Sequence, residues 1–234
     1  MQSGQPTIHR DPENDEARQV SAAKAYLASG EYIDSAHPAV AAFAQKHARG
    51  ESDLERSIAL YYAVRDHIRY NPFLNLSAAA AYRASDCLAA GEGFCVGKAS
   101  LLAATARAAG IPTRIGFADV KNHLTTPRLR EFMGNDEFIY HGYAELLIEN
   151  RWVKATPAFN LALCEKFRVK PLEFDGRNDS ILHPFDADER RHMEYLRDRG
   201  SFADVPVDEI RAAFREFYPR LYALRGEAAK ESFG

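Results

Sequence analysis

The chain has 234 residues, of which 46% are hydrophobic and 27% are charged, a composition typical of one globular domain with helical additions. Thirty Lys and Arg against 33 Asp and Glu give a formal net charge of -3, which argues against nucleic acid or an anionic membrane as a partner. No apolar run reaches the roughly 18 residues that span a bilayer, and the three cysteines form no CxxC pair and no disulfide framework. We therefore expect a soluble protein of a reducing cytoplasm.

The N-terminal part of the chain is predicted to be helical after a short arm. Residues 1–14 contain Gly, Pro and charge without apolar periodicity, which is typical of a mobile arm. Ser52 and Glu55 have capping-box spacing and mark the start of the longest of three expected helices. The three helices cover residues 15–29, 37–49 and 53–70.

The middle of the chain changes from helical to strand patterns. An Ala-rich segment before residue 91 favours a helix, and a second helix is expected from Cys95 to Gly110, where Pro112 prevents its continuation. Three strands follow, with a polar loop of functional-lid length at residues 119–136 between the first two. The strands cover residues 113–120, 138–149 and 151–157.

The C-terminal third returns to helical signals. Residues 186–200 begin with acids and end with basic residues before Gly200, and residues 207–225 have helical periodicity. This order of helices, strands and helices indicates an α+β fold. Residues 15–234 are expected to form a single domain, with helical elaborations at 15–70 and 170–230.

Cys95 is the first candidate for chemistry, because it follows the glycine-rich run GEGF at residues 91–94 and opens a predicted helix. The free N–H groups and positive dipole end of a helix N-terminus stabilise a thiolate and lower a thiol pKa from about 8.5. The competing interpretation is a small buried residue at the base of an Ala-rich helix. Cys87 and Cys164 have no such surroundings and are predicted to be buried and inert.

A cysteine nucleophile needs an imidazole base and a third group that orients the imidazole. His141, Tyr143 and Glu145 alternate along the second predicted strand and share one face. His141 can face Cys95 if this strand crosses the base of the helix. Glu145 is four residues further, roughly 13 Å along a strand, and is expected to be structural. Asp119 is expected in solvated turn chemistry, although a catalytic role is open for it.

These residues resemble the transglutaminase-like superfamily of papain-type cysteine enzymes. The resemblance covers residues 59–160 and rests on GEGFC with the following KASLLAATARAAGIPTR, the strand HGYAE and the run WVKATP, in the family's order. It implies a Cys-His-Asp triad on a helix packed against an antiparallel sheet, here with extra N- and C-terminal helices. It also implies acyl transfer through a thioester, with Cys95 as the nucleophile and His141 as the base.

The chain departs from the family pattern at the third member of the triad. Where the family has Asp after its Trp-Val strand, this chain has Thr156. Cysteine enzymes tolerate a neutral orienting group, since papain-like proteases use Asn. Thr156 and, four residues on, Asn160 are the candidates. The oxyanion hole is expected to use the Cys95 N–H and, at a position that resembles an upstream aromatic of the family, Tyr70. Gly93 and Phe94, directly before the nucleophile, complete the expected oxyanion and substrate-binding set.

Metals and cofactors are not expected. The eight histidines form no HExxH motif or tight cluster, and Lys98 is followed by Ala99 where a phosphate-binding loop needs Ser or Thr.

Three functions remain open. The first is a cysteine-dependent hydrolase or acyl transferase acting on a peptide, a protein or a small amide, with hydrolysis favoured. The second is a binding module of the same fold that has lost catalysis with the triad Asp. The third is an oligomeric structural protein, in which the aromatic residues near the C-terminus form an interface. The sequence does not fix the oligomeric state.

Overall fold

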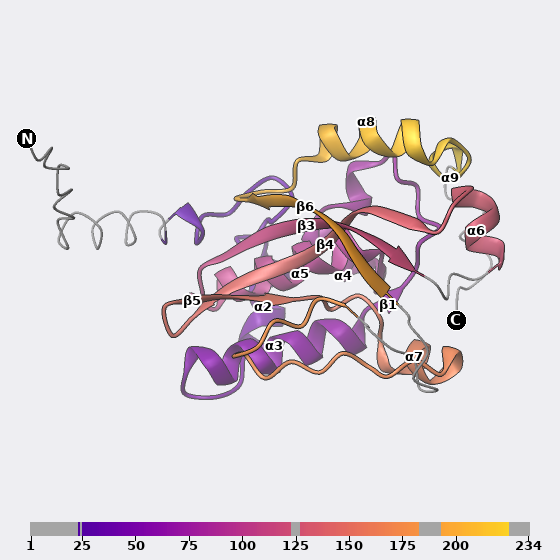
Figure 1. Ribbon diagram of the computed structural model, residues 1–234. Helices are drawn as coiled ribbons and strands as arrows, with labels where there is room; N and C mark the ends of the chain where they lie inside the picture. Colours follow the sequence, from indigo (N-terminus) through magenta and orange to yellow (C-terminus); the bar gives the residue numbers. More distant parts are fainter. Residues whose placement is uncertain (1–22, 24, 123–126, 183–192, 225–234) are drawn as a thin grey trace, which may run out of the picture.

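The computed structural model describes residues 23, 25–122, 127–182 and 193–224 (Figure 1). The expected arm at residues 1–14, and most of the first expected helix, lie outside the described residues. The described helices are α2 (Pro38–His47), α3 (Asp53–His67), α4 (Ala84–Ala90), α5 (Cys95–Ala108), α6 (Pro127–Met133), α7 (Leu161–Phe167), α8 (Val207–Phe217) and α9 (Pro219–Ala223). The strands are β1 (Arg69–Tyr70), β2 (Glu92–Gly93), β3 (Thr113–Asn122), β4 (Glu137–Ile148), β5 (Arg151–Ala155) and β6 (Met193–Phe202).

Helix α3 begins where its capping box predicts. The Ser52 hydroxyl accepts the Glu55 backbone N–H, and the Glu55 carboxylate accepts the Ser52 N–H in return. The helix ends at His67, three residues before the end of the predicted segment, because Arg69–Tyr70 form β1. β1 pairs in parallel with β2, which places Tyr70 beside Gly93.

The main sheet has four antiparallel strands in the order β5-β4-β3-β6. A tight turn joins β4 to β5, with Glu149 and Asn150 both at positive φ (49° and 62°), as a two-residue hairpin of this twist requires. Helix α5 packs on one face of β4 and β3 (Figure 1). The packing is close at Gly142, where a Cβ would meet the Val96 Cα at 3.0 Å. The sheet therefore crosses the start of α5, which meets the condition set for His141 to face Cys95.

Helix α5 is the centre of the hydrophobic core. Its residues from Cys95 to Arg107 are all buried, because α2, α3 and α4 cover the side that faces away from the sheet. The Ala-rich sequence permits this close approach on all sides.

Two predictions about the remaining elements were wrong. The described part of the expected helix at 186–200 belongs to the strand β6, which pairs with the edge of β3. Charged residues such as Arg197 and Asp198 suit an exposed edge strand as well as a helix surface, so the charge pattern does not distinguish the two. The loop at 119–136 contains the helix α6, whose Leu129 and Met133 are buried.

Candidate active site

Cys95 is the first residue of α5, as predicted. Phe94 is the N-cap residue in an extended conformation, and its side chain makes no capping hydrogen bond. The short strand β2 leads into this turn. Gly93 is required there, since a Cβ would lie 2.6 Å from the Cys87 sulfur. The Cys95 side chain is close to the surface of a cavity, but the residue is only 7% exposed.

The protonation state expected for Cys95 was wrong. Burial raises the pKa of the Cys95 thiol to about 11, although the backbone amides of Gly142, Val96 and Cys95 itself act in the opposite direction. The helix N-terminus thus does stabilise the thiolate, but exclusion of water outweighs it. At neutral pH the thiol of this closed site is protonated.

His141 lies on β4 opposite Ala118 of β3, and it lines the same cavity as Cys95. It is 4% exposed, and burial lowers the pKa of its imidazole to about 4. Its Nε2 is buried and has no hydrogen-bond partner among the described residues. The fold therefore brings thiol and imidazole into one cavity as two neutral groups, without a hydrogen bond between them in the part of the chain that the structure describes.

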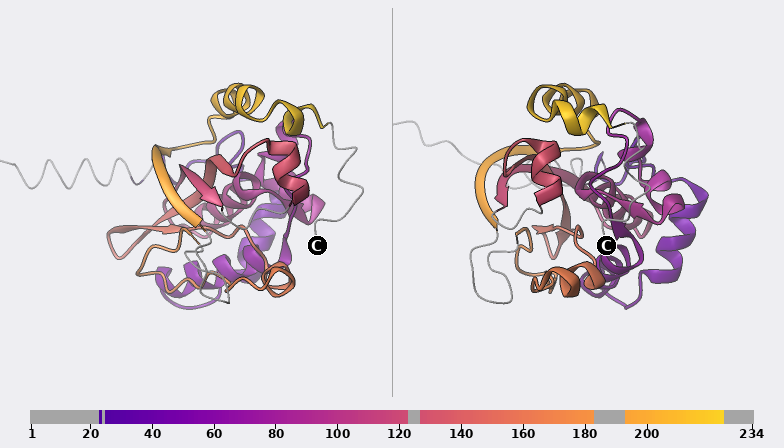
Figure 2. Two further views of the ribbon diagram at one scale, coloured as in Figure 1. Left: turned by 45° about the vertical axis from the view of Figure 1, so that its right-hand side comes forward. Right: turned by 90° about the vertical axis from the view of Figure 1, so that its right-hand side faces the viewer.

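The cavity is small, with a volume of about 40 Å³, and is almost entirely apolar. Helices α6, α8 and α9 contribute much of its lining, and they lie together on one side of the molecule (Figure 2). The lining residues are Tyr70, Pro72, Leu76, Phe94, Cys95, Leu129, Met133, Phe138, Ile139, His141, Phe214, Tyr218 and Leu221.

Two tyrosines are the other polar groups of the cavity. Burial, and then the charge of a Cys95 thiolate, raise the pKa of Tyr70, which lines the same cavity as Cys95. Tyr218 was not among the residues predicted from the sequence. Its hydroxyl accepts the Ile139 N–H at 2.6 Å and donates to the Glu137 carbonyl at 2.7 Å, which ties α8 to β4. The sequence signal that could have indicated it is a tyrosine at the end of a predicted helix, directly before Pro219, since a tyrosine that becomes buried needs a hydrogen-bond partner.

The two candidate orienting groups differ in what they contact. Thr156 follows β5 and is 2% exposed, and its hydroxyl oxygen has no hydrogen-bond partner among the described residues. The Asn160 side-chain oxygen accepts the Tyr70 backbone N–H at 3.1 Å. Asn160 is therefore engaged in holding β1, whereas the Thr156 hydroxyl is buried and uncommitted.

Two buried carboxylates, one on β3 and one on β4, have structural partners. Glu145 is 1% exposed and accepts from Arg114 and from the Ser201 hydroxyl, which confirms its structural interpretation. Asp119 was expected in a solvated turn, and this was wrong. It lies in β3, is 6% exposed and accepts from Arg199 and from the Tyr140 backbone.

Lys98, one turn after Cys95, is a buried amine. It is 0% exposed, and its Nζ donates to the carbonyl of Arg65 at 2.9 Å and to that of Ile68, at the end of α3. Burial lowers the pKa of Lys98 to about 7. A neutral amine still has two N–H donors, enough for both carbonyls.

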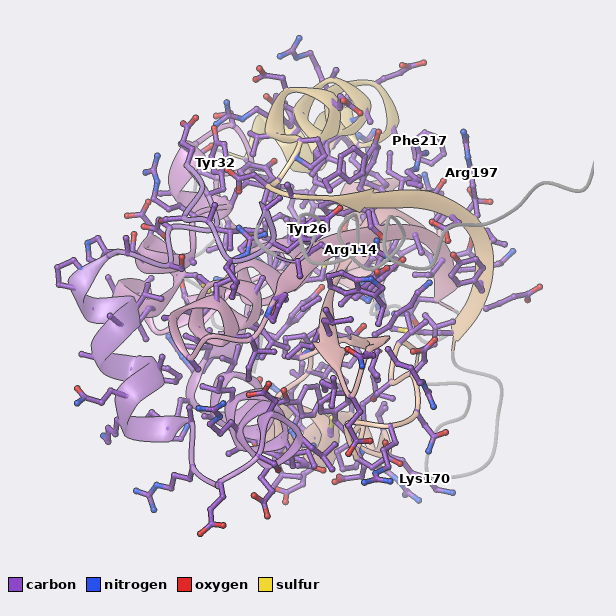
Figure 3. All side chains as sticks on the ribbon, turned by 90° about the vertical axis from the view of Figure 1, so that its left-hand side faces the viewer. Tyr26, Tyr32, Arg114, Lys170, Arg197 and Phe217 are labelled. Atoms are coloured by element: carbon purple, nitrogen blue, oxygen red, sulfur yellow. The ribbon has the colours of Figure 1, made fainter. Side chains whose placement is uncertain are left out.

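Lys98 is expected to make stability depend on alkaline pH. Between pH 7 and roughly 10.4 the unfolded chain binds this proton and the folded chain does not, so the free energy of unfolding rises with pH by up to about 1.4 kcal/mol per unit. Lys98→Met should remove this slope, whereas Lys170→Met, at an exposed position (Figure 3), should keep it. Urea denaturation from pH 6 to 10 measures both, and parallel curves for wild type and Lys98→Met would contradict the assignment.

Among the described residues, no group of three or more His, Cys, Asp or Glu side chains is placed to hold a metal ion. Within those same ranges, none of the helices has the length and apolar character needed to cross a membrane. All three cysteines are free thiols and buried.

Comparison with known proteins supports the family. The family model of the transglutaminase-like superfamily matches residues 41–157, which is half of the chain and includes Cys95, His141 and Thr156. No protein of curated function matches significantly.

Two solved structures are similar at low identity. A candidate cysteine protease from Cytophaga hutchinsonii is 16% identical with a TM-score of 0.44, and the match covers 85% of this chain and 56% of that one. A candidate protease from Parabacteroides distasonis is 17% identical with a TM-score of 0.38, over 60% of this chain and 26% of that one. The chain thus spans less than two thirds of either protein. The extent of the family match, over the helix and the strands that hold the cavity, shows that the chain belongs to the transglutaminase-like superfamily.

Proposed function

We propose that the protein is a cysteine-dependent hydrolase that cleaves an amide or peptide bond through a thioester on Cys95. The observation that carries the proposal is the shared cavity: a thiol at a helix N-terminus and an imidazole with an uncommitted Nε2 line one water-poor pocket. A buried histidine nitrogen without a partner is costly unless the site uses it. An active site supplies such a use.

The reaction starts from the neutral pair. His141 accepts the thiol proton as Cys95 attacks the carbonyl carbon, and the imidazolium then gives that proton to the leaving amine. Water attacks the thioester with His141 again as the base, which releases the acid and restores the thiol. Acyl transfer to an amine would follow the same steps with the amine in place of water.

The oxyanion is proposed to bind at the start of α5. The Cys95 backbone N–H faces the helix N-terminus, and Tyr70 lines the same cavity as Cys95. Thr156 is the better candidate for the orienting group, because its hydroxyl is buried and uncommitted while the oxygen of Asn160 accepts from Tyr70. Gly93 and Phe94 complete the site, Gly93 beside Tyr70 and Phe94 in the cavity lining.

The cavity lining suggests the substrate class. Leu76, Phe94, Met133 and Leu221 present apolar surface in the cavity that Cys95 lines. Burying a charged group there without a partner would be unfavourable. We therefore propose a peptide, protein or small amide substrate whose group next to the scissile bond is uncharged and apolar.

Alkylation of Cys95 by iodoacetamide tests the proposed pair. The neutral imidazole assists as a base above its pKa of about 4, and the free thiolate dominates only near pH 11. The rate should therefore show a plateau at intermediate pH and a rise at alkaline pH. In His141→Ala the plateau should fall by about 10²-fold, while the alkaline rise remains.

The same experiment separates the hydrolase from a binding module of this fold. Peptide mapping by mass spectrometry distinguishes Cys95 from the buried Cys87 and Cys164. Identical pH profiles for wild type and His141→Ala would show that the two side chains do not work together. The binding module, which the absence of the triad Asp favours, would then be the better description.

A further inference from the structure

Tyr140, directly before the proposed base His141, has an unusual backbone. Its φ is 52°, in the left-handed region, although it lies inside the strand β4 and is not glycine. Such a conformation costs about 1–3 kcal/mol and persists only where the surroundings enforce it. The facing strand β3 is irregular at the same level, since its register with β4 shifts between Ala118 and Val120.

One carboxylate holds this strained point. Asp119 lies inside that register shift, and its Oδ1 accepts the Tyr140 backbone N–H at 3.0 Å. The same oxygen accepts the Arg199 Nε at 2.6 Å, from β6. The Arg199 guanidinium also lies over the Tyr140 ring, 4.3 Å from its centroid. Backbone and side chain of Tyr140 are thus both fixed by a single ion pair, in which Asp119 is buried and Arg199 is partly buried.

The orientation of His141 depends on its backbone, because the usual alternative is absent. In a triad a carboxylate sets the direction of the imidazole. Here the His141 Nε2 and the Thr156 hydroxyl have no partners among the described residues. The direction of the ring is therefore left to packing and to the backbone that enters at Tyr140.

We propose that Asp119 and Arg199 are positioning residues, which lock the left-handed turn at Tyr140 and so direct the His141 imidazole toward Cys95. The inference rests on the proposed function for its catalytic meaning. It assigns no contact between Asp119 and the substrate or the reacting atoms.

Glu145 offers a matched control on the same strand. Like Asp119, it is a buried carboxylate paired with an arginine, Arg114, which lies near the ring of Tyr26 (Figure 3). It is four residues after His141, in regular register with β3, and contacts no strained backbone. Removing its charge should therefore cost comparable stability without moving His141.

The experiment compares Asp119→Asn with Glu145→Gln by two readouts in the full chain. The first is the plateau rate of Cys95 alkylation, and the second is the titration of the His141 imidazole by ¹⁵N NMR. Asp119→Asn should lower the plateau about tenfold or more, since small misplacements of a catalytic group have large effects. It should also move the His141 pKa from about 4 toward 6.5, because a displaced ring regains water. Glu145→Gln should leave both unchanged.

Glycine at the strained position provides a second arm. Glycine adopts positive φ without strain, so in a Tyr140→Gly background the Asp119→Asn change should alter the plateau by less than about twofold. Should Asp119→Asn fail to fold, Arg199→Lys retains the charge but not the planar group over the Tyr140 ring, and it should shift both readouts in the same direction.

The outcomes separate the two proposals. Unchanged plateau and titration in Asp119→Asn, or equal changes in Glu145→Gln, would overturn the positioning role. Equal alkylation rates in the wild type and His141→Ala would overturn the hydrolase. If the His141 pKa still changed in Asp119→Asn and not in Glu145→Gln, the positioning role would be retained.

Discussion

Replacing Cys95 by alanine is expected to lower peptide hydrolysis by a factor of about 10⁴ or more. The reason is that the thioester cannot form, and loss of a nucleophile removes the covalent route entirely. The measurement is turnover of fluorogenic peptide amides with an uncharged, apolar residue before the scissile bond, the group that the cavity lining fits.

Cys164→Ala is the matched control. Cys164 is another buried thiol, and burial raises its pKa to about 11 as well, but it lies on α7 and does not line the cavity. Its replacement should leave turnover within about twofold, apart from a loss of stability from the small void. Activity that survives in Cys95→Ala and not in Cys164→Ala would refute the assignment of the nucleophile.

Thr156→Asp is expected to increase activity at neutral pH by about 10- to 100-fold. The substitution restores the carboxylate of the family's triad, whose replacement by a neutral group in serine enzymes costs about 10⁴-fold. If a carboxylate at this position reaches the imidazole, as in the family's triad, it stabilises the imidazolium and so raises its pKa above the present value of about 4. The thiolate–imidazolium pair then persists to higher pH, and the alkylation rate should become larger and less dependent on pH around 7.

Two variants test the physical reason. Thr156→Asn has a similar size to Asp without its charge, and it should give a smaller increase than Thr156→Asp. Thr156→Val removes the hydroxyl, and a loss of activity well beyond threefold would show that this hydroxyl does orient the imidazole. Because Thr156 is 2% exposed, Thr156→Asp should also lose a few kcal/mol of stability at a pH where His141 is neutral. No gain of activity at any pH would contradict the proposed role of the site.

Local signals were sufficient for the elements that carry the candidate chemistry. The glycine-rich run before Cys95, the stop at Gly110 and the alternation along β4 depend on neighbouring residues, and the structure confirms α5 and β4. The capping box at Ser52 is also a local signal, and the structure confirms the start of α3 that it predicted. Family resemblance added the pairing of Cys95 with His141, which local patterns do not encode.

Features that depend on distant contacts could not be predicted. β6 is a strand because β3 offers it an unpaired edge, and its own charge pattern also suits a helix. The pKa of Cys95 depends on how completely side chains from α6, α8 and α9 exclude water, and no sequence window contains that information. The contact of Asp119 with Tyr140 requires a register shift between two strands.

The cover that α6, α8 and α9 form has a consequence for covalent chemistry at Cys95. Leu129, Phe214 and Leu221 line the same small cavity as Cys95. Narrow, uncharged electrophiles should therefore reach the sulfur, whereas wide or anionic ones should be excluded. Inhibitors would then be selected by their size and charge before their intrinsic reactivity matters. Narrow aliphatic electrophiles are therefore the most suitable starting point for a selective covalent probe of Cys95.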